Sequence, residues 1–186
     1  VAEQILKPMG IKALFFIVSD FVALTNRDEA QHFIIQHIEP GRKVNEIPDH
    51  LYNMSWSDLE VLLELGHNVG GHTLTHARLS QVKTDIDLER EIIHSGDTLE
   101  KRLGVSIQHF AYTFGDLASF SKKALAITRR RYRFIYSGLR GDNSADVSPF
   151  ALRRDAVTIN DSTALLGAFL EGAADQLYAR SCADLD

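Results

Sequence analysis

Short apolar runs alternate with amphipathic segments along this chain, and the alternation predicts the order of its elements. Lys12 to Ser19 is almost continuously apolar, which is typical of a strand buried on both faces of a parallel sheet. Further strands are predicted at His67 to His72, Val105 to Thr113, Phe134 to Ser137 and Leu152 to Ile159. No repeat or linker interrupts the pattern, so residues 1–186 are expected to form a single domain.

Helical periodicity fills most of the segments between these strands. Val1 to Met9 indicates the end of a helix, and Glu39 to Ser55 is a long polar loop that suggests a functional rim or an insertion. Helices are predicted at Asp28 to Ile38 after Thr25 or Asn26, Trp56 to Gly66, Asp85 to Leu103, Ser119 to Tyr132, and from a cap at Asp161 or Ser162 to Ala179.

The helix that starts at Trp56 carries a well-marked start signal. Ser57 and Glu60 are spaced as a capping box, and Trp56 and Val61 are placed to form a hydrophobic staple around it. Gly66 then marks the end of the helix.

Strand and helix alternate about five times, which predicts an α/β fold with a parallel sheet. A complete eight-unit (β/α) barrel takes about 250 residues. This chain has 186 residues, so an irregular or incomplete barrel is expected. In such folds the functional groups gather at the carboxyl ends of the strands. Asp20, His72, the turn 113–115 and the pair 137–138 all follow predicted strands.

The composition and charge of the chain argue against several kinds of partner and site. The net charge is −5 and the pI about 5.9, which argues against a nucleic-acid partner. The basic run at 129–133 is typical of a solvated helix end. One cysteine, Cys182, excludes an internal disulfide and a cysteine-rich zinc site. No apolar run reaches about 18 residues, so no transmembrane helix is predicted. The chain carries no signal peptide, but it also lacks an initiator Met.

Two histidines follow the glycine pair Gly70-Gly71, and they are the first candidate for chemistry. If the chain after Gly71 turned into a helix, His72 and His76 would share one face, with Cβ atoms roughly 5–6 Å apart. Two imidazoles at that spacing can bind one zinc ion. The alternative is a chance pair of hydrogen-bonded structural histidines. Their position at a strand end favours the metal.

Several motifs, in order, resemble one known family. His72-Thr73-Leu74-Thr75-His76 is similar to the H-[ST]-x-x-H metal motif of the NodB-like polysaccharide deacetylases, carbohydrate esterase family 4. Residues 12–16 resemble the second-strand signature of that family, and residues 55–57 also fit. Residues 110–115 (FAYTFG) resemble its F-x-Y-P-[YF]-G segment.

The resemblance implies a distorted (β/α) barrel of about seven strands that hydrolyses N- or O-acetyl groups on a glycan with a divalent metal, zinc above all. It implies that His72 and His76 bind the metal and that the backbone N–H of Phe114 stabilises the oxyanion. Tyr112 and Arg154 are the candidate substrate contacts, with Arg153 as an alternative to Arg154. The alternative to a role in the site is that Tyr112 and Phe114 are aromatic side chains of the core or of the rim. A glycan substrate would place the protein outside the cytoplasm or in the cell envelope.

Three departures from the family pattern bear on activity. The T-F-D-D-G segment, which would supply the base and a third metal ligand, is absent. Thr113 replaces a proline, and Ala111 stands where many members have an arginine. No histidine follows His109, so the late catalytic histidine of the family is missing. Asp20 is the nearest substitute carboxylate, because it ends a neighbouring predicted strand. Asp116, Asp142 and Asp155 are further candidates that belong to no family motif.

Three hypotheses follow. The first is a deacetylase domain whose base comes from residues outside this chain. The second is an inactive glycan-binding or scaffolding domain of the same fold. The third is a structural domain whose histidines bind nothing.

Overall fold

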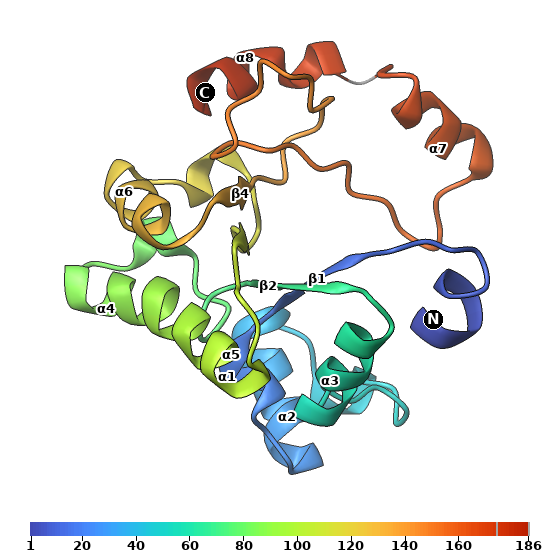
Figure 1. Cartoon of the computed structure of the whole chain (residues 1–186), viewed down its shortest axis with the longest axis vertical. Coiled ribbons are helices and arrows are strands. Elements are labelled where there is room, and N and C mark those ends of the chain that lie inside the picture. The colour runs from blue at the N-terminus through green and yellow to red at the C-terminus, as the bar shows by residue number, and fades with distance from the viewer. Residues whose placement is uncertain (174, 186) are drawn as a thin grey trace.

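The fold is a curved, all-parallel four-stranded sheet covered by helices on its outer side (Figure 1). The computed structural model describes residues 1–173 and 175–185. Its strands are β1 (Leu14–Ile17), β2 (Asn68–Gly71), β3 (His109–Ala111) and β4 (Phe134–Tyr136), paired in the order β1-β2-β3-β4. The predicted α/β fold with a parallel sheet is confirmed, and it contains four of the roughly seven strands that the resemblance implies.

Eight α-helices and six short 3-10 or π-helical turns connect and flank these strands in the described part of the chain. The α-helices are α1 (Ser19–Val22), α2 (Arg27–Phe33), α3 (Trp56–Glu64), α4 (Asp85–Glu89), α5 (Ser95–Leu103), α6 (Lys122–Arg131), α7 (Thr163–Leu170) and α8 (Asp175–Leu185). The turns are η1 (Ala2–Leu6), η2 (Ile34–Ile38), η3 (Val44–Glu46), η4 (Leu79–Gln81), η5 (Arg90–His94) and η6 (Leu117–Ser119).

The sheet curls because its first and last strands contact each other across the inner face. The ring centroids of Phe16 on β1 and Tyr136 on β4 are 5.1 Å apart, although two strands lie between them in the pairing order. Gly70 on β2 leaves room for this contact, since a Cβ there would lie 2.8 Å from Phe16 Cδ1 and 3.0 Å from the His109 carbonyl oxygen. The result is part of a barrel, with β1 at its free edge.

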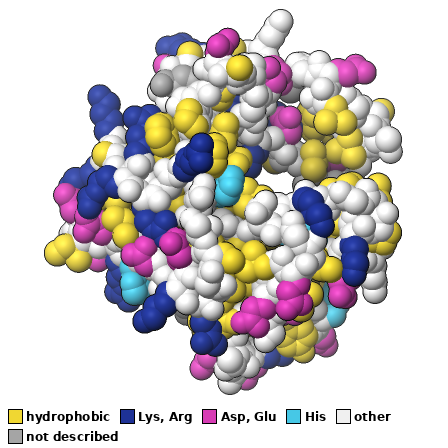
Figure 2. Space-filling view, in the orientation of Figure 1, with side chains coloured by type: hydrophobic (Ala, Val, Ile, Leu, Met, Phe, Trp, Pro, Cys, Tyr) yellow, Lys and Arg dark blue, Asp and Glu magenta, His cyan; other side chains and the backbone are white. Residues whose placement is uncertain are grey.

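The main core lies between the sheet and its outer helices. Ile17, Val69, Phe110 and Ile135 contribute one side chain from each strand, and the outer helices contribute residues such as Leu59, Leu88, Ile92, Leu99 and Ile127. A second, smaller cluster of Leu139, Ala151, Cys182 and Leu185 anchors α8. On the face drawn in Figure 2, basic and acidic side chains are interspersed. No helix in the described ranges is long and apolar enough to cross a membrane.

Two predicted elements are wrong at the carboxyl end of the chain. Leu152 to Ile159 is not a strand: Leu152 makes one isolated bridge to Tyr136, and beyond it Val157 and Ile159 are 57% and 101% exposed. The β-branched residues that suggested a strand therefore have no sheet neighbour. The last helix begins at Ser162, one of the two predicted caps, but it ends before Gly172, whose φ is +75°, and α8 follows separately.

The start of α3 is shifted by two residues from the prediction. Ser55 is the N-cap: its Oγ accepts a bond from the Asp58 amide at 3.2 Å, and its own amide donates to Asp58 Oδ2 at 2.7 Å. The box of Ser57 and Glu60 is therefore wrong. With Ser55 as the cap, Trp56 is the first residue of the helix and not the residue before the cap, so the predicted staple with Val61 is also wrong. Trp56 packs against the main core instead.

Replacing Ser55 with Ala should lower the free energy of unfolding by about 0.5–2 kcal/mol, because the Asp58 amide loses its side-chain acceptor. Ser57→Ala is the matched control, since this exposed serine caps nothing and its loss should change stability little. Urea unfolding of both variants measures the difference. Equal stability of the two variants would remove Ser55 as the cap.

Candidate metal and catalytic site

The two histidines converge in a loop rather than on a helix. Residues 72–76, which we call the histidine loop, follow β2 directly, and Thr73 and His76 both have a φ of +66°. The helical spacing expected after Gly71 is therefore wrong. The turn nevertheless brings the ring centroids of His72 and His76 to 5.2 Å, at the carboxyl end of the sheet. Loop geometry thus replaces helix geometry in bringing the imidazoles together.

Both imidazoles are oriented by main-chain carbonyls. His72 Nδ1 lies 2.7 Å from the Ala111 oxygen, and His76 Nδ1 lies 2.9 Å from the His37 oxygen. A carbonyl oxygen only accepts hydrogen bonds, so each Nδ1 carries the proton and each Nε2 keeps a free lone pair when the ring is neutral. Partners of this kind fix the tautomer of metal-binding histidines.

The surroundings also keep both rings neutral. Burial lowers the pKa of His72 to about 4, against the opposing effect of its bond to Ala111. Burial likewise lowers the pKa of His76, again opposed by its bond to a carbonyl, that of His37. A metal binds the neutral imidazole, so both side chains are ready as ligands at neutral pH.

A buried carboxylate holds the histidine loop in shape. Glu91, 9% exposed, accepts bonds from the amides of Leu74 and Thr75 at 3.1 and 3.0 Å and from Thr75 Oγ1 at 2.8 Å. Its oxygens are therefore committed to the loop. The sequence motifs do not include this residue, although an acidic side chain on the same buried stripe as Leu88 and Ile92 is a visible signal.

A cavity of about 300 Å³ opens beside the two rings. Its inner wall is apolar, and its rim comes from the long polar loop. The lining residues are Phe16, Ile17, Val18, Phe21, Val22, Ile38, Tyr52, Asn53, Met54, His72 and His76. Asn53 fixes the rim, since its Nδ2 donates to the carbonyls of Phe21 and Leu24 at 2.9 and 2.8 Å. Part of the segment 39–55, which was expected to form a functional rim or an insertion, therefore lies at the edge of this cavity.

None of the four candidate carboxylates lines this cavity. The Asp20 amide bonds to the Leu74 oxygen, and burial followed by repulsion from Glu91 raises the pKa of its carboxyl group. Asp116 pairs with Arg78 at 2.8 Å. Asp142 and Asp155 pair with Arg153 and Arg140 in the carboxyl-terminal part of the chain. Across residues 1–173 and 175–185, no group of three His, Cys, Asp or Glu side chains could hold a metal.

Phe114 and Tyr112 lie on opposite sides of the strand end. Phe114, with a φ of +63°, is 46% exposed, and its ring centroid lies 5.2 Å from that of His76. Tyr112 is fully buried, stacks on Phe120 at 3.9 Å and bonds to Thr128, and burial raises its pKa to about 12. A substrate contact through the Tyr112 side chain does not fit this position, which is that of a core aromatic.

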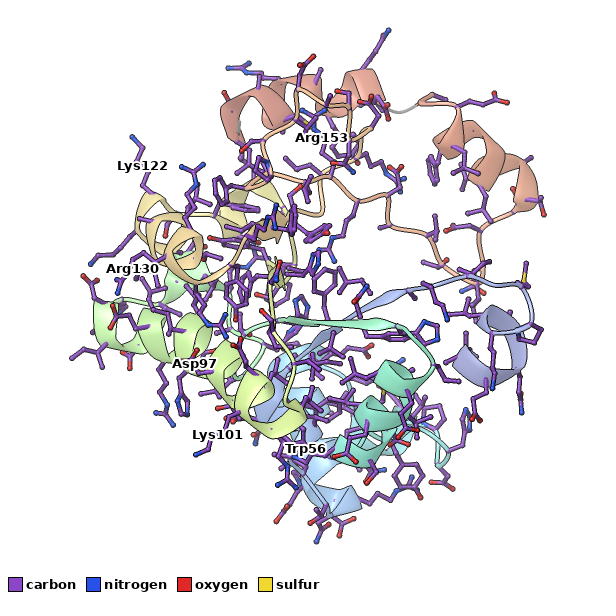
Figure 3. The ribbon with its side chains drawn as sticks, viewed as in Figure 1. Trp56, Asp97, Lys101, Lys122, Arg130 and Arg153 are labelled. Atoms are coloured by element: carbon purple, nitrogen blue, oxygen red, sulfur yellow. The ribbon has the colours of Figure 1, made fainter. Side chains whose placement is uncertain are left out.

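Arg154, and not Arg153, lies on the inner side of the barrel. Arg154 Nε donates to the Ser137 oxygen at 2.6 Å, and its guanidinium carbon is 5.3 Å from the Phe16 ring centroid. Burial lowers the pKa of Arg154, and its positive charge contributes to the low pKa of His72. Figure 3 places Arg153 in the carboxyl-terminal segment beneath α8, where its backbone amide bonds to Asn143.

Comparison with known proteins now identifies the family. A family model described as polysaccharide deacetylase matches residues 2–131. The chain belongs to the polysaccharide deacetylase family. The resemblance found in its motifs is thereby confirmed. The comparison with curated proteins found no match.

Solved structures of deacetylases share the fold. The Streptococcus pyogenes deacetylase PplD in complex with acetate has a TM-score of 0.68 at 20% identity, over 91% of this chain and 63% of that chain. The BpsB deacetylase domain from Bordetella bronchiseptica scores 0.64 at 13% identity, over 82% and 63%. IcaB from Ammonifex degensii scores 0.58 at 19% identity, over 91% and 63%. This polysaccharide deacetylase chain thus spans 63% of the length of each of these three structures.

The low pKa of His72 predicts a pH dependence of stability in metal-free protein. As the pH falls from 6.5 to about 4, the unfolded chain takes up this proton before the folded chain does. The contribution of the neutral, buried His72 ring to the free energy of unfolding is therefore complete above pH 6.5. It is lost as the pH falls through the pKa of the folded state. In the His72→Gln variant, the unfolding free energy should fall by roughly 1–3 kcal/mol less over that pH range than in the unmodified protein.

Denaturant unfolding at pH 7 and pH 4.5 measures this effect. The exposed His50 supplies the control variant, His50→Gln, which should follow the unmodified protein at both pH values. A His72→Gln protein that loses as much stability on acidification as the control would contradict the burial argument.

Proposed function

We propose that this domain removes acetyl groups from an acetylated polysaccharide by metal-assisted hydrolysis. One observation carries the proposal: His72 and His76 face each other at a strand end with both Nδ1 atoms held by carbonyls. Within the described residues the hydrogen bonds of both rings are made by Nδ1, which leaves both Nε2 atoms available to one ion. Family membership supports the reaction class. With a glycan as substrate, we expect the protein to act outside the cytoplasm.

The donor set fits zinc in part. A catalytic zinc takes three protein ligands and keeps one open position, and His72 and His76 fit two of these places. No third ligand is found in the described part of the chain. When bound, zinc supplies a water of lowered pKa and polarises the acetyl carbonyl. We expect the third ligand and the general base to be aspartates on a strand that pairs with the free edge of β1.

The side chains of this domain would then divide the remaining tasks. The Phe114 amide donates to the oxygen on which negative charge develops, at the position its motif gives it. Arg154 brings a positive charge to the inner side of the site, where we expect it to contact substrate. The apolar wall formed by Phe16, Ile17 and Val22 keeps bulk water from the acetyl group.

A second function remains open for the 186-residue chain taken alone. A non-catalytic glycan-binding or scaffolding domain would need the same cavity but no base. The absence of a described carboxylate among the residues that line the cavity favours this alternative. The two functions differ in turnover and not in fold, so activity on chains of different length separates them.

The 186-residue chain should release almost no acetate from an acetylated chito-oligosaccharide in the presence of zinc. A chain extended upstream through an Asp-Asp pair should turn over at about 1 s⁻¹ or more. In the extended chain, His72→Ala or His76→Ala should abolish stoichiometric zinc, measured by elemental analysis, while the exposed control His50→Ala should retain it.

Three outcomes would count against this account. Unchanged zinc in the His72 or His76 variant would contradict the metal assignment. Turnover near 1 s⁻¹ by the 186-residue chain would show that a carboxylate of this chain is the base. A folded, zinc-loaded extended chain that releases no acetate would favour the binding domain.

A further inference from the structure

Two loops meet at the site, and a compact set of contacts joins them. The segment that leaves the histidine loop contributes Ala77 and Arg78, and the loop after β3 contributes Thr113, Asp116 and Ser119. Thr113 Oγ1 donates to the Ala77 oxygen at 2.5 Å. Arg78 Nη1 lies 2.8 and 3.0 Å from the two carboxylate oxygens of Asp116 and 2.8 Å from Ser119 Oγ. We call these five residues the Arg78 clamp.

The clamp also holds the exposed ring of Phe114. The guanidinium carbon of Arg78 lies 4.3 Å from the centroid of this ring, within the range of a cation–π contact. The edge of the same ring meets His76, with centroids 5.2 Å apart. Phe114 is 46% exposed, so these two neighbours, rather than core packing, fix its orientation.

The backbone at both ends of this contact needs support. His76 and Phe114 have φ angles of +66° and +63°, in the left-handed region that L-residues rarely adopt. Such conformations persist where the surroundings over-determine them. The Arg78 clamp joins the residues that directly follow His76 to residues on both sides of Phe114.

We infer that Arg78 is a positioning residue that sets the Phe114 amide against the His76 imidazole. The guanidinium is suited to this task because Nη1 bonds to Asp116 and Ser119 while the rest of the planar group lies over the Phe114 ring. A lysine ammonium is a compact point charge with no planar group to cover the ring. The catalytic consequence rests on the proposed function, whereas the placement of Phe114 does not.

The ion pair itself is stable at working pH. The hydrogen bond from Arg78 is the largest of the effects that lower the pKa of Asp116, so the carboxylate stays charged well below neutrality. Ser119 Oγ donates to Asp116 Oδ1 at 2.8 Å and fixes the acceptor as well. The clamp is thus a closed set of partners and not a single exposed salt bridge.

Arg78→Lys is the decisive variant, and Arg131→Lys is its matched control. Arg131 also makes two carboxylate contacts, to Asp97 and Glu100 at 2.7 Å each. Asp97 lies on α5 in the outer helical layer (Figure 3). Both substitutions replace a carboxylate-bound guanidinium with an ammonium and keep the charge, so both should lower the temperature of thermal unfolding. Only the loss of Arg78 should disturb the site.

NMR on the 186-residue chain provides the readout that needs no activity. With Arg78→Lys, the cross-relaxation between the ring protons of Phe114 and His76 should disappear, and the order parameter of the Phe114 amide should fall from about 0.85 to below about 0.6. With Arg131→Lys both signals should stay. If Arg78→Lys does not fold, Asp116→Asn opens the same clamp from its other side and takes its place.

Kinetics on the extended chain add a second readout. Arg78→Lys should lower kcat by about 10–100-fold with KM within twofold, because a misplaced oxyanion donor affects the transition state and not substrate binding. Unchanged NMR signals in Arg78→Lys, or equal losses in Arg131→Lys, would overturn the inference. If the extended chain proves inactive, the proposed function fails, and the NMR result still decides the placement of Phe114.

Discussion

The histidine loop depends on one constraint: five residues must turn sharply enough to bring two imidazoles together without a glycine. Thr73 and His76 adopt positive φ angles to do so, at a cost of order 1–3 kcal/mol each. Three hydrogen bonds to the Glu91 carboxylate offset this cost, because bonds to a charged group contribute about 1.5–3 kcal/mol each. A side chain in the outer helical layer therefore determines the geometry of the site.

The sheet contributes a second constraint, which acts from the inner side. Gly70 allows Phe16 and Tyr136 to meet, and that contact curls the four strands into part of a barrel. The curl brings the carboxyl ends of β1, β2 and β3 around one cavity, where Ala111 and His37 supply the carbonyls that orient the rings. β1 is the first strand in the pairing order, and its residues Phe16 and Ile17 line the same cavity.

Local and periodic signals in the sequence were reliable. The apolar runs located all four strands, Gly66 and Gly104 follow the ends of α3 and α5, and Asn26 and Ser162 cap the helices as expected. Two expectations failed for different reasons. The run after Leu152 has strand composition, but tertiary structure gives it no neighbouring strand to pair with. The box expected at Ser57 failed because the sequence offers two local capping boxes, and the one formed by Ser55 and Asp58 is adopted.

The proximity of the two candidate ligands was predictable from the sequence, whereas the residues that support them were not. The motif identified His72 and His76, but helical spacing was the wrong reason for their proximity, since the loop turns back instead. Tyr112 shares a motif with Phe114 yet points into the core, because the chain leaves β3 before Phe114 and the positive φ of Phe114 turns its side chain outward. The contacts of Glu91 and Arg78 join segments 16 to 41 positions apart, and sequence periodicity can place Glu91 on a buried face but does not identify the partners of either residue.

The central claim is that His72 and His76 present their Nε2 atoms to one ion. Two-bond ¹H–¹⁵N spectra of the labelled protein test it most directly, because they report the tautomer and metal binding of each ring separately. We predict that both rings are protonated at Nδ1 before zinc is added, and that both Nε2 resonances shift together along a single zinc titration. Protonation at Nε2 in either ring, or a zinc titration that shifts only one of them, would contradict the account.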